Sequence, residues 1–409
     1  MYINNKSIYE REREQRKQEQ LIQILRRRFK TYGYTKMKTQ AFEEYDLYAK
    51  VNRSINLKKM IKVIDQTGNV LVLRPDMTLP MTRQIAQEFS EVSRGIKDYY
   101  IEDVVRQSEI EQTPLGRTQA GVEYYGNPSE EADAEVIALA IHILKDLGFK
   151  DIKVEMGDAG FFKALTQNMN LNGLQFYELK QLIQAKNAVD IERFLDNISV
   201  KDEIKQIVKH MPFLYGKPEY VLNMIRELPL TEEMTHKIDY LYRLVDLLNM
   251  YGLKEHLIID LGLINQMDYY SDVIFQGFVE RVGEPVMMGG RYNQLAESFQ
   301  ADIPAIGFAC FIDLLVAAAP IEELEDLLDV CVVYEKSQLE QSIQLANDLR
   351  QREYRVITTE NQAQVDQFKA IFLVTLKEIG YELVFKGEDY QFKDRLTLLD
   401  FIDKQREGI

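Results

Sequence analysis

The stretch that decides the fold runs from residue 260 to residue 315 and holds three apolar runs: D-L-G-L-I-N-Q-M-D-Y-Y-S-D-V-I-F (260–275), V-M-M-G-G-R-Y-N-Q-L (286–295) and I-P-A-I-G-F-A-C-F-I-D-L-L (303–315). The branched and aromatic residues of Ser271–Phe275 predict a short strand. The adjacent Tyr269 and Tyr270 would then point to opposite faces, so that one lines a pocket and the other packs behind it.

The second and third runs predict a turn and a helix. Gly289 and Gly290 predict either a sharp turn or a close approach of the backbone to a ligand. The run 308–319 is apolar at nearly every position and predicts a buried helix. A strand, a glycine turn and a buried helix with polar groups at their ends are typical of a small-molecule pocket.

Length and composition indicate a multidomain globular protein. A chain of 409 residues with 46% hydrophobic and 28% charged residues predicts two or three domains. The net charge of −15 argues against a large phosphate-binding surface, so we expect no nucleic-acid partner. Cys310 and Cys331 lie in apolar runs and are expected to be buried thiols. The N-terminus has no apolar signal core and no run reaches membrane-spanning length, which predicts a cytoplasmic protein without a membrane partner.

Motifs for nucleotide, metal and nucleophile chemistry are absent from the sequence. There is no Walker loop, no G-x-G-x-x-G, no G-x-S-x-G and no paired His/Cys spacing, so we expect no cofactor and no metal. The histidines are scattered in helical stretches and are expected to be surface or packing residues: His142, His210, His236 and His256.

The N-terminal part alternates helices with strands. Apolar residues at helical spacing predict a helix over 10–32, which Gly33 ends. Alternation around the turn 65–69 predicts a hairpin over 60–73, and a helix follows over 79–89. Asp76 and Thr78 stand at this junction of strand and helix. Each is either a helix cap or a ligand group that faces a cation, and the spacing favours neither reading.

Two further predicted strands carry polar groups. The first covers 97–105 and ends at Arg106, and the second covers 118–125. On the second strand Gln119 and Glu123 share one face with Gly121. A buried carboxylate on that face needs either a protein cation or a ligand as its partner.

The rest of the chain divides by pattern. A helix is expected over 130–147, followed by a helical insertion at about 160–253 that concentrates no chemistry. The insertion separates the two halves of a sheet domain spanning 1–320. The spacing of apolar residues changes after Pro320, and strands separated by a helix predict a small α/β domain over 329–409.

The polar side chains at the strand ends suit a zwitterion. They comprise two carboxylates, one arginine and several amide or hydroxyl groups: Asp76, Thr78, Arg106, Gln119, Glu123, Tyr269, Tyr270 and Tyr292. A carboxylate accepts hydrogen bonds from an α-ammonium, and an arginine pairs with an α-carboxylate. Residue chemistry alone predicts a small amino-acid-like ligand in an antiparallel-sheet pocket.

These residues also occur in motifs that resemble a known family. The motifs are Leu73-Arg74-Pro75-Asp76-Met77-Thr78, Arg106, Gln119-Ala120-Gly121-Val122-Glu123, Met267-Asp268-Tyr269-Tyr270, Gly289-Gly290-Arg291-Tyr292 and Ala305-Ile306-Gly307-Phe308-Ala309. In this order they resemble the class II histidyl-tRNA synthetases over roughly residues 8–320. The resemblance implies an α+β fold, with an antiparallel sheet flanked by helices.

The resemblance also implies roles for the pocket residues. Asp76 and Thr78 would hold the α-amino group of histidine, and Arg106 would reach its carboxylate. Gln119 would lie beside the amino acid. The two imidazole nitrogens would be taken by Glu123 and Tyr270. Tyr269 and Tyr292 would form walls of the pocket.

The sequence departs from the synthetases at functional positions. Asn265 and Leu314 stand where the synthetases carry arginines that neutralise ATP phosphates, and their loss removes electrostatic stabilisation of adenylate formation. Arg117 replaces a usual aromatic residue. Gln40 replaces the usual proline of the dimer interface, which leaves the details of that interface open.

A histidine pocket without these arginines resembles the regulatory-subunit family of short-form ATP phosphoribosyltransferase. That resemblance implies no activity of its own and a short catalytic subunit as partner. It also implies self-association as a dimer, a hetero-octamer, and feedback inhibition by histidine of the first step of histidine biosynthesis. Two alternatives remain: an active histidyl-tRNA synthetase, and a histidine-binding module with another partner.

Overall fold

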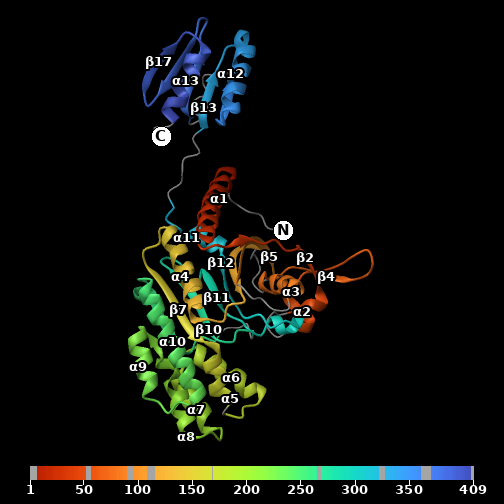
Figure 1. The fold of residues 1–409 in the computed structure, drawn as a ribbon, viewed down its shortest axis with the longest axis vertical. Coiled ribbons are helices and arrows are strands. Elements are labelled where there is room, and N and C mark those ends of the chain that lie inside the picture. Colours follow the sequence, from red (N-terminus) through yellow and green to blue (C-terminus); the bar gives the residue numbers. More distant parts are fainter. Residues whose placement is uncertain are drawn as a thin grey trace. The chain divides into compact units, whose positions relative to one another are not determined.

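The computed structural model describes residues 7–51, 57–89, 95–107, 116–167, 169–264, 269–321, 328–360 and 370–406. The chain divides into two compact units, residues 1–321 and 322–409. Figure 1 shows the elements of each unit along the chain.

The first unit is built on one large sheet. Within the described residues its nine strands are, in spatial order, β1 (Thr35–Lys36), β5 (Ile96–Val105), β6 (Gly116–Tyr125), β12 (Ala305–Phe311), β11 (Met287–Arg291), β10 (Val273–Val279), β7 (Ile152–Asp158), β9 (Leu257–Asp260) and β8 (Tyr215–Gly216). The central strands from β5 to β7 pair antiparallel. Parallel pairs occur only toward the edges in these residues, between β1 and β5 and between β7 and β9. The expected α+β fold is confirmed, with a sheet that is mixed at its margins.

One face of this sheet is covered by helices. Helices α1 (Ile8–Thr31), α4 (Glu130–Asp146) and α11 (Ile312–Ala318) pack with the sheet into one apolar core. The stripe predicted on the first helix is real, because Leu21, Leu25 and Phe29 are fully buried at a spacing of four residues. Burying each such side chain contributes about 1.5–3 kcal/mol. The helix ends where Gly33 takes a φ of 81°, as expected for a residue just past a helix end.

The opposite face carries a smaller layer. A second sheet contains β2 (Phe42–Glu44), β4 (Val70–Leu73) and β3 (Lys62–Ile64), and its hairpin matches the prediction over 60–73. Helices α2 (Tyr45–Val51) and α3 (Thr78–Glu88) lie beside it. The helix α3 starts directly after the segment that carries Asp76.

The insertion forms a helical group at the side of the sheet where β7, β9 and β8 lie (Figure 1). Its helices are α5 (Ala159–Gln167), α6 (Gly173–Gln184), α7 (Ala188–Asp196), α8 (Asp202–His210), α9 (Pro218–Arg226) and α10 (Glu232–Met250). Several are short, with strong apolar stripes that meet at buried residues such as Leu179, Ile207 and Leu241.

The second unit is an α/β domain. Its sheet has the order β14 (Val356–Thr359), β13 (Leu328–Val333), β15 (Ala370–Leu376), β16 (Tyr381–Phe385) and β17 (Glu388–Phe392). The helices are α12 (Leu339–Gln351) and α13 (Arg395–Arg406). Strand β13 pairs parallel with both β14 and β15, whereas β16 and β17 continue antiparallel. The sequence reading of partly parallel strands was correct but omitted the last two strands and the last helix.

The helix predicted over 308–319 was wrong in its first part, and of the two alternatives for Gly289 and Gly290 the sharp turn is excluded. Residues 308–311 belong to strand β12, and the helix begins only at Ile312. Strand β12 is paired on both sides, and most of its residues are buried on both faces, so the run shows no alternation. Gly289 and Gly290 lie inside strand β11 rather than in a turn. A Cβ on Gly289 would fall 2.4 Å from the carbonyl oxygen of Gly307, so close packing requires glycine there.

Candidate ligand-binding site

A cavity of about 1130 Å³ lies over the sheet face opposite α4. All eight residues singled out from the sequence line it: Asp76, Thr78, Arg106, Gln119, Glu123, Tyr269, Tyr270 and Tyr292. They come from four places in the chain: the start of α3, strand β6 with the end of β5, the segment before β10, and the residue after β11. The strand order brings these places together.

The floor of the cavity is made of glycines and the side chains they admit. Glu123 on β6 pairs in register with Gly307 on β12, and Gly307 pairs with Gly290 on β11. A Cβ on Gly307 would lie 1.8 Å from Glu123 Oε2, and one on Gly290 would lie 2.8 Å from the ring of Tyr270. Glycine at these positions therefore leaves the space that the Glu123 carboxylate and the Tyr270 ring occupy.

Glu123 is a buried carboxylate held by hydroxyl groups. Thr78 Oγ1 donates to its Oε1 at 2.7 Å, and the Tyr292 hydroxyl donates to its Oε2. No lysine or arginine in the described part of the chain pairs with it. Burial raises the pKa of Glu123 to about 8, although the two hydroxyl donors oppose that rise. The site can supply a proton acceptor or, when Glu123 is protonated, a donor.

The helix-cap role of Asp76 is confirmed, and its role as a ligand group stays a prediction. Its Oδ1 accepts a hydrogen bond from the backbone N–H of Leu79 at 2.8 Å and so caps the first turn of α3. Its Oδ2 is buried and has no hydrogen-bond partner among the described residues. Burial raises the pKa of Asp76, while the bond from Leu79 and the charge of Arg106 lower it. The unpartnered oxygen is suited to a cationic ligand group.

Arg106 and Gln119 complete the polar lining. Arg106 Nε donates to the carbonyl oxygen of Pro75 at 2.5 Å, which holds the guanidinium beside the segment of Asp76. Gln119 is buried at the end of the same sheet face as Glu123. Arg106 thus shares one cavity with Asp76 and Glu123, and the lining also includes Lys58, Lys59 and Asp260.

The three tyrosines form an aromatic wall. The ring centroids of Tyr269 and Tyr270 are 4.7 Å apart, and Tyr269 meets Tyr292 edge-on at 5.8 Å. The prediction that Tyr269 and Tyr270 point to opposite faces was wrong, because both line the cavity. Strand β10 begins only at Val273, so the alternation of a strand does not apply to them.

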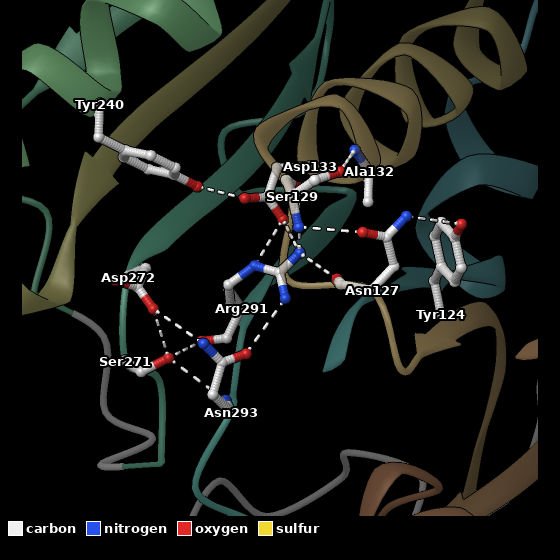
Figure 2. A network of polar contacts seen from close by, with 10 residues as sticks. All are labelled: Tyr124, Asn127, Ser129, Ala132, Asp133, Tyr240, Ser271, Asp272, Arg291 and Asn293. Carbon is white, nitrogen blue, oxygen red and sulfur yellow. Dashed lines mark hydrogen bonds and ion pairs between the residues drawn. The ribbon is translucent and has the colours of Figure 1, made fainter. Parts of the chain in front are cut away.

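A polar network centred on Arg291 and Asp133 joins strand β11 to helix α4 (Figure 2). Arg291 is 2% exposed, and its Nε donates to Oδ1 of Asp133 on helix α4 at 2.7 Å. The Tyr240 hydroxyl from α10 donates to the other oxygen of Asp133. The carbonyl oxygen of Arg291 accepts from the backbone N–H of Ser271 at 2.9 Å. The network fixes the chain directly beside Tyr270 and Tyr292.

Sequence reasoning missed several of these residues. Arg291 was part of a quoted motif but received no role, and Asp133 was not considered. The insertion also reaches the site, since Gln184 at the end of α6 lines the cavity together with Asp260 and Gln276. Among the described residues of the insertion, Gln184 is the one that lines the cavity.

The positions that depart from the synthetase motifs lie outside the cavity lining or outside the described residues. Leu314 is half-buried against the apolar core of the first unit. Asn265 lies outside the described residues. Arg117 at the start of β6 and Gln40 are exposed. No cation therefore reaches the cavity from position 314.

Other features of the described residues concern the cysteines, possible metal ligands and helix hydrophobicity. Cys310 and Cys331 are buried free thiols. The described residues contain no cluster of three or more side chains suited to a metal ion. Among the helices of those residues, none combines the length and apolar character that a membrane crossing requires.

Comparison with known proteins gives the family. The family model for histidyl-tRNA synthetase matches residues 10–315. The ATP phosphoribosyltransferase regulatory subunit of Oceanobacillus iheyensis is 39% identical over 377 residues, covering 92% of this chain and 92% of that protein. The protein of the same name from Ruminiclostridium cellulolyticum is 31% identical over 389 residues, covering 93% and 92%.

Solved structures agree in fold. An ATP phosphoribosyltransferase regulatory subunit/histidyl-tRNA synthetase from Bacillus halodurans superposes with a TM-score of 0.78 at 27% identity, over 88% of this chain and 94% of that one. The histidyl-tRNA synthetase of Nostoc sp. has a TM-score of 0.77 at 19% identity, over 96% of each chain, and shows the fold alone. The chain belongs to the histidyl-tRNA synthetase family and, within it, to the ATP phosphoribosyltransferase regulatory subunits.

Proposed function

We propose that this regulatory subunit binds histidine in the cavity and passes feedback inhibition to a short catalytic subunit of ATP phosphoribosyltransferase, at the first step of histidine biosynthesis. The observation that carries the proposal is the pair of buried carboxylates, Asp76 and Glu123, beside Arg106 in one cavity. Neither carboxylate forms an ion pair with a described lysine or arginine. A ligand that brings positive charge and N–H donors would satisfy both.

Histidine matches this arrangement group by group. Its α-ammonium would donate to the bare Oδ2 of Asp76 and to Thr78, and its carboxylate would face Arg106 with Gln119 alongside. Its imidazole nitrogens would meet Glu123 and Tyr270. Tyr269 and Tyr292 would stack around the ring, since both already line the cavity.

The assembly belongs to the same proposal. We infer that the chain self-associates as a dimer and joins the short catalytic subunit in a hetero-octamer in the cytoplasm. The support is the name shared by its relatives, which are subunits of ATP phosphoribosyltransferase. Co-purification with that catalytic subunit, followed by mass measurement of the complex, tests the composition. Recovery of the regulatory chain without the catalytic subunit would contradict it.

The synthetase alternative has its own test. Aminoacylation requires an adenylate, and the two arginine positions that neutralise ATP phosphates hold Asn265 and Leu314. We expect no histidine-dependent exchange of labelled pyrophosphate into ATP by the pure protein. Brisk exchange would restore the synthetase reading.

The sharpest test of the histidine site is Asp76→Asn in the assembled complex. Asparagine keeps the Oδ1 acceptor that caps α3 but removes the charge that meets the α-ammonium. A hydrogen bond to a charged group contributes about 1.5–3 kcal/mol, so the histidine concentration for half-inhibition should rise roughly tenfold or more. The matched control is Asp151→Asn, because that side chain is 71% exposed. An unchanged inhibition curve for Asp76→Asn in a normally assembled complex would refute the site.

A further inference from the structure

The helical insertion meets the loop beside the cavity at several points, which include the backbone hydrogen bond from Leu261 to Leu214 and two polar contacts from the end of α6. Gln184, at the end of α6, donates from Nε2 to the carbonyl oxygen of Ile264 at 2.6 Å. Two residues further on, Lys186 Nζ lies 3.0 Å from Asp260 Oδ2. Asp260 is the last residue of β9, Ile264 lies in the loop that follows it, and both line the cavity. We call these four residues the insertion contact.

The backbone at Lys186 is shaped for this contact. Its φ is 51°, in the left-handed region that favours glycine at a helix end. Its N–H donates to the carbonyl oxygen of Ile183 and the N–H of Asn187 to that of Leu182, which closes α6 in a Schellman arrangement. Asn187 then caps α7 through the N–H of Asp190. Lys186 is therefore fixed between two capped helices, with its side chain directed at the sheet.

The partners of Lys186 belong to the sheet. Tyr215 on β8 and Asp260 on β9 are cross-strand neighbours, and Lys186 Nζ lies 3.3 Å from the centroid of the Tyr215 ring. The Tyr215 hydroxyl donates to Glu155 on β7 at 3.0 Å. The lysine thus binds a carboxylate and an aromatic face together, a stronger arrangement than an exposed ion pair.

Asp260 connects this cluster to the cavity. Its other oxygen, Oδ1, accepts from the backbone N–H of Gly262 at 2.8 Å and so shapes the loop 260–264. A Cβ on Gly157 would lie 2.6 Å from the carbonyl oxygen of Asp260, so the loop lies directly on β7. The side chain of Asp260 is 9% exposed, and one charge holds both the loop and the insertion.

We propose that Lys186 is a positioning residue that joins the insertion to the cavity loop, so that a ligand in the cavity also orders α6 and α7. The identity of the ligand rests on the proposed histidine site. The link that Lys186 makes between the insertion and the cavity loop does not depend on that site. Loop and insertion should therefore open together in the ligand-free protein.

Hydrogen exchange of the full-length chain tests the joining without ligand. Lys186→Met keeps the aliphatic stem over Tyr215 and removes the charge. We expect amides in 182–188 and in 260–264 to exchange about fivefold faster or more in this variant, because the Lys186 contacts stabilise both segments. The matched control is Lys209→Met, which removes the same charge from a surface pair with Glu192 at 3.8 Å within the insertion. Faster exchange in only one segment, or in neither, would overturn the proposal.

Added histidine tests whether a ligand in the cavity also orders the insertion. Calorimetry first gives the saturating concentration for each protein. Histidine should then slow exchange in 182–188 in the wild type and in Lys209→Met but not in Lys186→Met. Equal protection in all three would show that the insertion senses the ligand by another route. Absence of histidine binding to the wild type would refute the proposed function, while the ligand-free comparison would still decide the joining.

Discussion

Glu123→Gln tests the charge at the floor of the cavity, and its effect should depend on pH. The carboxyl group is buried and its pKa is raised to about 8. At pH 7 it is ionised in roughly one molecule in eleven. If the ligand N–H binds only the carboxylate form, ionising Glu123 first costs about 1.4 kcal/mol. At pH 9 that cost falls to about 0.1 kcal/mol. Affinity conferred by Glu123 therefore increases as the pH rises through 8.

The expected loss of binding free energy follows from the ionisation cost and the strength of the hydrogen bond. A charge-assisted hydrogen bond contributes about 1.5–3 kcal/mol. After the ionisation cost, the glutamine variant should lose only about 0.1–1.6 kcal/mol at pH 7 but nearly the full amount at pH 9. The ratio of the dissociation constants of variant and wild type should thus grow about tenfold over this range. The amino group of free histidine titrates in both measurements and cancels from the ratio.

Isothermal titration of histidine into the purified chain at pH 7, 8 and 9 measures this ratio. Thermal unfolding of the same samples shows whether the variant is folded. Glu135→Gln is the control, since that carboxylate pairs with Lys97 away from the cavity lining, and its ratio should stay flat. A ratio for Glu123→Gln that is constant within about twofold would refute the reasoning that the ligand engages an ionised Glu123.

Two further variants test the support of the site. Asp133→Asn leaves the buried guanidinium of Arg291 without its counter-charge, and the free energy of unfolding in urea should fall by about 3 kcal/mol or more. Gly307→Ala places a methyl group on the position of the Glu123 carboxylate; histidine binding measured by calorimetry should be lost because the cavity floor is filled.

The controls for these variants remove comparable groups elsewhere. Asp146→Asn breaks an ion pair with Arg28 whose side chains are about 30% exposed, so its cost should stay within about 1 kcal/mol. Gly173→Ala adds a methyl group where nothing lies within 4 Å, and it should leave histidine binding unchanged. Equal effects of Asp133→Asn and Asp146→Asn would contradict a structural role for the buried pair. Full binding by Gly307→Ala would contradict the assigned floor.

The sequence by itself determined the local elements and the identity of the cavity side chains. The first helix followed from a stripe of apolar residues, and the hairpin over 60–73 followed from its turn. Chemistry-bearing residues at strand ends, together with their resemblance to a known family, named eight of the side chains that line the cavity. These features depend on neighbours within a few positions, which a sequence displays directly.

Only the tertiary structure decided how distant segments share one site. Arg291 and Asp133 are 158 positions apart, and no local pattern links them. Residues 308–311 form a strand because partners on both sides bury them, which erases the alternation that would have revealed it. Lys186 contacts Asp260 because its left-handed backbone at the end of α6 places the side chain beside the β8–β9 pair. Long-range packing and pairing set these features, because their energies depend on which surfaces the folded chain brings together.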